Sequence, residues 1–128
     1  MRFLLDTQLA IWIPASSPRL SKSLLRILAS RQDEFLFSVV SLWEIAIKRS
    51  TGKLDVRLDP RGIRRQMVNA GYQELSINGD HAVHVDTLPP IHKDPFDRLL
   101  IAQAMVEGIT LLTADETIAR YPGPIRKV

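Results

Sequence analysis

Short apolar runs of strand length recur along this chain and alternate with stretches of helical periodicity. Short continuous apolar runs bounded by polar or turn residues are typical of strands that are buried within a sheet. The runs that predict strands are Phe3–Leu5, Phe35–Phe37, residues 72–77 and Ile109–Thr113.

The segments between these runs carry patterns typical of helices. Residues 21–31 place three leucines on one face and basic side chains on the other, as an amphipathic helix does. Asp-Pro pairs and glycines mark helix starts and stops. The predicted helices are one that begins at Thr7 after a capping Asp6, and those over residues 21–31, 41–50, 59–71, 79–85, 94–108 and 114–120.

The order of these elements predicts an α/β fold. Strands that alternate with helices indicate a central, mostly parallel sheet covered by helices. Residues 87–93 contain Pro89-Pro90 and are expected to form a loop. Because no repeat, linker or low-complexity tract interrupts the pattern, we expect residues 1–128 to form a single domain.

Four acidic residues follow the predicted strands or begin the helices next to them. Asp6 comes directly after the first strand, and Glu44 lies in the first predicted helical turn after the second. Asp97 lies in the first turn of the helix over residues 94–108, and Asp115 comes two residues after the last strand. Functional sites of open parallel sheets lie beyond the carboxyl ends of the strands, so we expect these four side chains to converge.

Each acid taken alone also has a purely structural interpretation. It could cap a helix, complement a helix N-terminus, or belong to a capping box of the kind that Ser41–Glu44 and Thr113–Glu116 resemble. Four converging carboxylates repel one another, however, and their burial is unfavourable unless a cation neutralises them. Oxygen ligands of this kind suit Mg²⁺ or Mn²⁺, which can activate a water for in-line attack on a phosphodiester.

The composition is consistent with this chemistry. The chain has 128 residues, 17 Lys and Arg, 14 Asp and Glu, and no Cys, which excludes a disulfide scaffold, a Cys-based zinc ribbon and a thiol nucleophile. The net charge is +3; without the four candidate acids, 17 basic residues face 10 acidic ones, a balance of +7 that suits a polyanionic partner. With no signal-peptide pattern and no long apolar run, we expect a cytoplasmic protein without a membrane association.

Four motifs occur in an order that closely resembles the VapC toxins, which are PIN-domain ribonucleases of type II toxin–antitoxin systems. They are Leu4-Leu5-Asp6-Thr7, Ser41-Leu42-Trp43-Glu44-Ile45, the segment from His92 to Ala104, and Leu111-Leu112-Thr113-Ala114-Asp115. The resemblance extends from residue 3 to about residue 120, and its most specific part is DPFDRLLIAQA.

The resemblance implies a PIN-like three-layer α/β/α sandwich with a Mg²⁺- or Mn²⁺-dependent endoribonuclease activity that leaves 5′-phosphate ends. It carries the family's acidic quartet onto Asp6, Glu44, Asp97 and Asp115 as catalytic metal ligands, of which Asp115 matches the most variable position. Thr113 matches a small hydroxyl residue that supports the site. The implied partners are an RNA substrate, a cognate antitoxin and a second copy of the chain in a homodimer.

Two other functions remain as alternatives. One is a PIN fold that binds RNA without cutting it. The other is a receiver-like signalling module, although that would require adjacent acids after the first strand and a Lys after a late strand, and neither is present.

Several other residues have more than one interpretation. Arg98 could be a structural ion-pair partner or a phosphate contact, and Asp94 is expected to cap a helix. His81, His84 and Asp86 make a poor zinc site, and no His is expected to act as a general base. A group of basic residues could contact RNA or an acidic antitoxin segment, or form solvated helix faces; these are Lys48, Arg49, Lys53, Arg61, Arg64 and Arg65.

Overall fold

A five-stranded parallel sheet forms the centre of the protein. The computed structural model describes residues 1–128 and orders the strands β3-β2-β1-β4-β5. The first strand lies in the middle and pairs in parallel with β2 and β4. The strands are β1 (Arg2–Leu5), β2 (Glu34–Ser38), β3 (Gln73–Leu75), β4 (Thr110–Thr113) and β5 (Ile125–Lys127).

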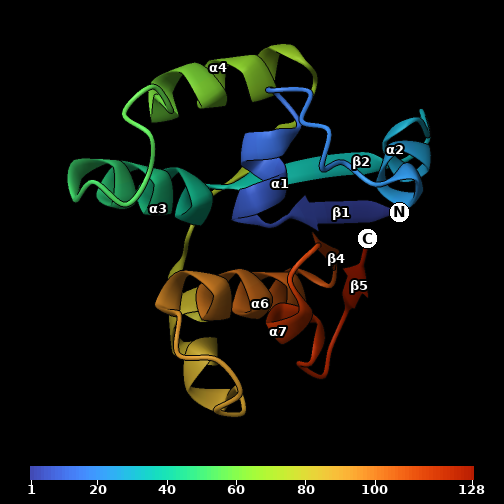
Figure 1. Cartoon of the computed structure of the whole chain (residues 1–128). Helices are drawn as coiled ribbons and strands as arrows, with labels where there is room; N and C mark the ends of the chain where they lie inside the picture. Colours follow the sequence, from blue (N-terminus) through green and yellow to red (C-terminus); the bar gives the residue numbers. More distant parts are fainter.

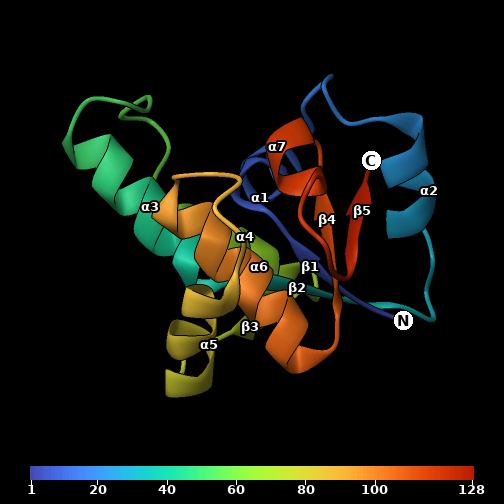
Figure 2. The same cartoon turned by 90° about the horizontal axis from the view of Figure 1, so that it is seen from below.

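Helices cover both faces of this sheet, which makes the three-layer α/β/α sandwich expected from the sequence (Figure 1). On one face lie α1 (Thr7–Trp12), α2 (Lys22–Leu28) and α4 (Pro60–Asn69), and α3 (Val39–Ser50) contacts both α1 and α4. Figure 2 views the opposite face, where α6 lies against the sheet and α5 packs beside it. That face carries α5 (Gly79–His84), the 3-10 turn η1 (Val85–Thr87), α6 (Pro95–Glu107) and α7 (Glu116–Ala119).

The alternation of side chains along the strands creates two separate cores. In β1, Phe3 and Leu5 pack in the core beneath α1, α2 and α4, whereas Leu4 packs in the core beneath α6. The same alternation places Leu112 and Leu111 of β4 on opposite faces. Full burial of a side chain of this size contributes roughly 1.5–3 kcal/mol, so the central strands are held from both sides.

The two capping boxes that the sequence motifs resemble do not form. Helix α3 begins at Val39 and is capped by Ser38, whose hydroxyl accepts a hydrogen bond from the Val40 amide at 2.9 Å. Ser41 therefore lies inside the helix, and Glu44 lies in its second turn rather than its first. Helix α7 is capped by Asp115, not Thr113.

Other element boundaries also differ from those expected. The helix over residues 21–31 ends at Leu28, and the last helix covers four residues. Strand β5 was not expected, because it is short and two of its three residues are exposed; it forms through parallel pairing with β4. No helix is both long and apolar enough to cross a membrane.

Two glycines offer a matched test of the local structure. Gly108 ends α6 in the left-handed region with φ +66°, so Gly108→Ala should destabilise the protein by about 1 kcal/mol. Gly62 lies inside α4, where an added Cβ would meet its nearest neighbour at 3.8 Å, so Gly62→Ala should stabilise by about 0.5–1 kcal/mol. Urea unfolding of both variants measures the difference, and equal effects would contradict this account.

Candidate functional site

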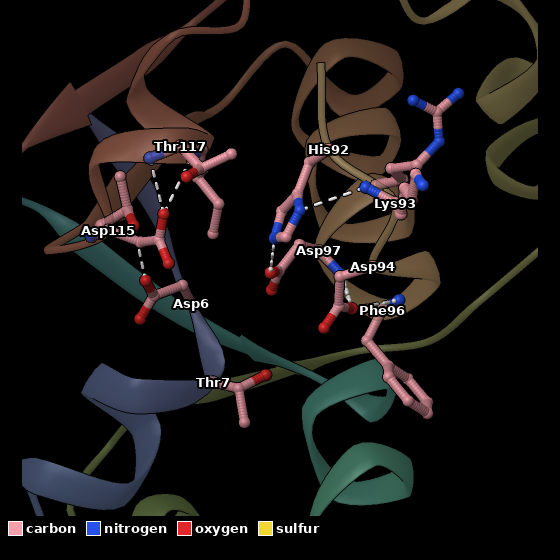
Figure 3. Close-up of polar contacts among 12 residues, drawn as sticks. Asp6, Thr7, His92, Lys93, Asp94, Phe96, Asp97, Asp115 and Thr117 are labelled. Carbon is pink, nitrogen blue, oxygen red and sulfur yellow. Dashed lines mark hydrogen bonds and ion pairs between the residues drawn. The ribbon is translucent and has the colours of Figure 1, made fainter. Parts of the chain in front are cut away.

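A polar cavity of about 280 Å³ lies beyond the carboxyl ends of the central strands. All four candidate acids line it, although they come from segments more than a hundred residues apart. Figure 3 shows Asp6 and Asp115 on one side of this space and Asp97, with Asp94 and His92, on the other. The complete lining comprises Asp6, Thr7, Gln8, Ile11, Glu44, Lys48, Leu54, His92, Asp94, Asp97, Asp115 and Ile118.

Asp6 is held by two hydrogen-bond donors at the end of β1. As the cap of α1, its Oδ1 accepts from the Leu9 amide at 2.9 Å, and its Oδ2 accepts from the Thr113 hydroxyl at 2.6 Å. The residue is only 2% exposed, and burial raises its pKa to about 6, with a further contribution from the negative charge of Asp115. Asp6 is therefore both a helix cap and an acid whose ionisation is unfavourable where it lies.

Asp115 shares Thr113 with Asp6. Its backbone amide donates to the Thr113 hydroxyl at 2.9 Å, so this one hydroxyl connects the ends of β1 and β4. The Asp115 side chain caps α7, because its Oδ1 accepts from the amides of Thr117 and Ile118. The support that Thr113 was expected to provide is thus a hydrogen bond to the neighbouring acid.

Glu44 is buried and makes an ion pair. Its Oε1 accepts from the Thr7 hydroxyl at 2.7 Å, and its Oε2 pairs with the Lys48 ammonium one helical turn later. Burial lowers the pKa of Lys48, but the hydrogen bond and charge of Glu44, with the charges of Asp94 and Asp97, outweigh this and raise it. Lys48 therefore remains protonated and supplies a positive charge next to the acids.

Asp97 faces the other acids from the first turn of α6. Asp94 caps this helix by accepting from the amides of Phe96 and Asp97, as expected. Burial, together with the negative charges of Asp94 and Glu44, raises the pKa of Asp97 to about 7, against the opposing influence of His92. The His92 Nε2 atom lies 3.0 Å from Asp97 Oδ2.

The donor set of this cavity fits a hard divalent cation. Five carboxylates line it with one lysine, and burial, reinforced by neighbouring negative charges, raises the pKa values of Asp6 and Asp97, so ionised acids are unfavourable here without a cation. Carboxylate oxygens without thiolates suit Mg²⁺ or Mn²⁺. The acids that could hold such an ion are Asp6, Glu44, Asp97 and Asp115.

Lys48 and His92 line the cavity but were not assigned to the site from the sequence. Lys48 was considered only as part of a basic surface, although its spacing of four residues from Glu44 on one helix predicts an ion pair. His92 was noted only as part of a motif. It lies in a loop without periodicity, so the sequence does not predict the direction of its ring.

The structure also decides what Arg98 contacts. Its guanidinium donates to the carbonyl oxygens of Val85 and Pro89, at 3.1 and 2.9 Å, and to the Tyr121 hydroxyl at 3.1 Å. It makes no ion pair with a carboxylate, so its role is to hold the segment that precedes α6. Similarly, His81 is a buried structural residue whose Nε2 lies 3.0 Å from Glu107.

Half of the candidate basic surface is engaged by acidic partners. Lys48 pairs with Glu44, Arg64 with Glu74, and Arg49 more loosely with Asp59. No ion pair is formed by the remaining three residues of that group, Lys53, Arg61 and Arg65. Of the six basic residues considered from the sequence, only three therefore remain without an acidic partner in the structure.

Comparison with known proteins identifies the family. The family model of the PIN domain matches residues 3–124. The chain belongs to the PIN domain family. No curated protein sequence is significantly similar to it.

Solved structures with the same fold include chains of toxin–antitoxin complexes. A chain of VapBC2 from Rickettsia felis, crystallised with a DNA fragment from the promoter, superposes with a TM-score of 0.73 at 16% identity, covering 100% of this chain and 99% of that one. A chain of DNA-bound VapBC from Salmonella typhimurium superposes with a TM-score of 0.65 at 19% identity. The match covers 99% of this chain and 98% of that one. A chain of VapBC-5 from Mycobacterium tuberculosis, described as a member of the VapBC family of toxin–antitoxin systems, superposes with a TM-score of 0.65 at 16% identity. The match covers 99% of this chain and 97% of that one.

The raised pKa of Asp97 predicts a pH-dependent stability without divalent cations. Between its ordinary value of 3.8 and about 7, the folded PIN domain binds more protons than the unfolded chain, so its stability falls as pH rises through this range. Asp97→Asn removes this loss. The variant should melt on the order of 5 °C above the wild type at pH 8 in EDTA, with the difference disappearing near pH 4.

Asp33→Asn is the matched control for this thermal-melting experiment. A hydrogen bond from the N-terminal ammonium lowers the pKa of Asp33, so its carboxylate stabilises the fold above its ordinary pKa and loses that effect as pH falls. Asp33→Asn should therefore give no gain at pH 8. A lower melting temperature for Asp97→Asn at pH 8 would contradict the view that the buried, ionised Asp97 destabilises the fold.

Proposed function

We propose that this PIN-domain protein is the toxin of a type II toxin–antitoxin system and that it acts as a divalent-cation-dependent endoribonuclease. The observation that carries the proposal is the convergence of four buried or half-buried acids on one cavity, two of which have strongly raised pKa values. A purely structural set of helix caps would not need to share a cavity. Perturbed acids gathered in a cleft are typical of functional sites.

The proposed metal ligands are Asp6, Glu44, Asp97 and Asp115. Bound Mg²⁺ or Mn²⁺ would supply a water of lowered pKa and offset the negative charge of the phosphodiester. The Thr113 hydroxyl orients the Asp6 carboxylate, and Lys48 forms an ion pair with Glu44. Because the chain has no Cys and the Thr7 hydroxyl is engaged by Glu44, we assign no nucleophile to the protein itself.

The sequence motifs and the fold support the proposal that the substrate is RNA and that the partner is an antitoxin. The motifs resemble those of VapC ribonucleases, and the structural neighbours come from complexes described as VapBC or toxin–antitoxin. The net positive charge outside the acids is consistent with a polyanionic substrate. Homodimer formation, a single-domain organisation and a cytoplasmic location stay predictions.

The family match bears on only one of the two alternative functions. Membership of the PIN family argues against the receiver-like module. The first experiment below distinguishes the proposed nuclease from a PIN fold that binds RNA without cutting it.

The nuclease proposal predicts cation-dependent cleavage of RNA. The purified protein should cut RNA in Mg²⁺ or Mn²⁺, leave 5′-phosphate ends and lose activity in EDTA. Asp6→Asn and Asp97→Asn should each lower the cleavage rate by about a hundredfold or more, because each removes a charged ligand. Gel assays and sequencing of 5′-phosphate ends measure the rate and the target.

Asp80→Asn is the matched control, because Asp80 is exposed on α5 and does not line the cavity. It should cleave like the wild type. Full activity of Asp6→Asn or Asp97→Asn would refute the mechanism. Tight RNA binding by the wild type without cleavage would favour the non-cutting alternative.

The toxin proposal makes a separate prediction in cells. Expression of the chain alone should arrest growth, and co-expression with the small protein encoded by a neighbouring gene should restore it. The two proteins should copurify. A chain that purifies alone and does not slow growth would contradict the toxin assignment while leaving the nuclease assay unaffected.

A further inference from the structure

The Asp97 carboxylate differs from the other buried acids in how it is held. Asp6 accepts from a backbone amide and a hydroxyl, and Glu44 contacts a hydroxyl and an ammonium. Asp97 has one side-chain hydrogen bond, which joins its Oδ2 to His92 Nε2 at 3.0 Å. The orientation of this carboxylate therefore depends on one imidazole.

The surroundings of the His92 ring determine which nitrogen carries the proton. The Lys93 amide donates to His92 Nδ1 at 3.1 Å, so Nδ1 must present its lone pair (Figure 3). A neutral imidazole has one N–H group, which then lies on Nε2 and donates to Asp97. With its proton on Nε2, the ring has no free lone pair directed at the acids, although His92, Asp94 and Asp97 have potential ligand atoms within 4.8 Å of one another.

The backbone of His92 is held in place from the other side. The Tyr121 hydroxyl accepts from the His92 amide at 2.7 Å and lies 3.3 Å from the His92 carbonyl oxygen, to which it donates. Arg98 donates to the same hydroxyl at 3.1 Å and to the Pro89 carbonyl at 2.9 Å. Tyr121 is only 4% exposed, so this anchor belongs to the core.

We propose that His92 is a positioning residue that orients the Asp97 carboxylate for cation binding without being a ligand, and that Tyr121 and Arg98 hold it in place. The inference rests on the proposed function, in which Asp97 is a metal ligand. Groups that hydrogen-bond to metal ligands fix their direction, and their loss commonly weakens metal affinity about 10–100-fold.

Mn²⁺ binding to the full chain, measured by electron paramagnetic resonance or calorimetry, tests the proposal. His92→Ala should weaken binding about 10–100-fold. His92→Gln should restore most of it, because a carboxamide N–H can replace Nε2–H as the donor. Tyr121→Phe, which removes the anchor and keeps the ring packing, should give an intermediate loss.

Nitrogen NMR of the histidines in the cation-free protein provides a readout independent of binding. At a pH where the ring is neutral, it should show the proton of His92 on Nε2 rather than on Nδ1. The proposal is overturned if His92 carries its proton on Nδ1, if His92→Ala binds Mn²⁺ like the wild type, or if a folded His92→Gln binds as weakly as His92→Ala. The last comparison separates orientation from mere integrity of the fold.

Asp97→Asn distinguishes this inference from the function on which it rests. If wild type binds Mn²⁺, Asp97→Asn does not and His92→Ala binds like wild type, the inference alone fails. If wild type and Asp97→Asn bind equally, Asp97 is not a ligand, and the proposed function fails together with the inference.

Discussion

The burial of several carboxylates around one cavity is the constraint on which this structure depends. A parallel sheet brings the ends of β1, β2 and β4 to one edge, and each of these ends leads to an acid that lines the same cavity. The raised pKa values of Asp6 and Asp97 reflect mainly their burial, with a further contribution from the neighbouring negative charges. Hydrogen bonds and an ion pair from nearby polar residues lower the free-energy cost of this arrangement.

Hydrogen bonds and an ion pair offset part of the cost of burying these acids. Asp6 and Asp115 are connected through Thr113, and Glu44 has its own lysine. Asp94 and Asp115 also cap helices, so helix N-termini stabilise charges that the cavity concentrates. Structural and functional interpretations of these acids are therefore compatible, because the hydrogen bonds that cap the helices also fix where the carboxylates lie.

The features that the sequence predicts well are those carried by local patterns. Asp6 and Asp115 directly follow buried strands, and Asp-Pro and Gly mark both ends of α6, so the layers and the convergence of the acids could be anticipated. Contacts between segments far apart in the sequence could not be anticipated in this way. Two serines, Ser38 and Ser41, compete as the cap of α3, and only the packed helix selects the first.

The same limit applies to the loop before α6 and to the last strand. The direction of the His92 ring depends on Tyr121, which lies 29 residues further along the chain. Strand β5 has little apolar pattern of its own and exists because β4 offers it an open edge. In both places a partner far away in the sequence determines the local conformation.

The contact between Thr113 and Asp6 spans 107 residues and joins the first strand to the fourth. A chain leaving the ribosome therefore exposes Asp6 long before the hydroxyl that orients it, or Asp115, has been synthesised. Long-range pairing of this kind forms late in folding because the intervening loop must first be closed. Chains that stop short of Asp115 thus lack the assembled cavity, and whatever chemistry it performs begins only after Asp115 has been synthesised and the sheet has formed.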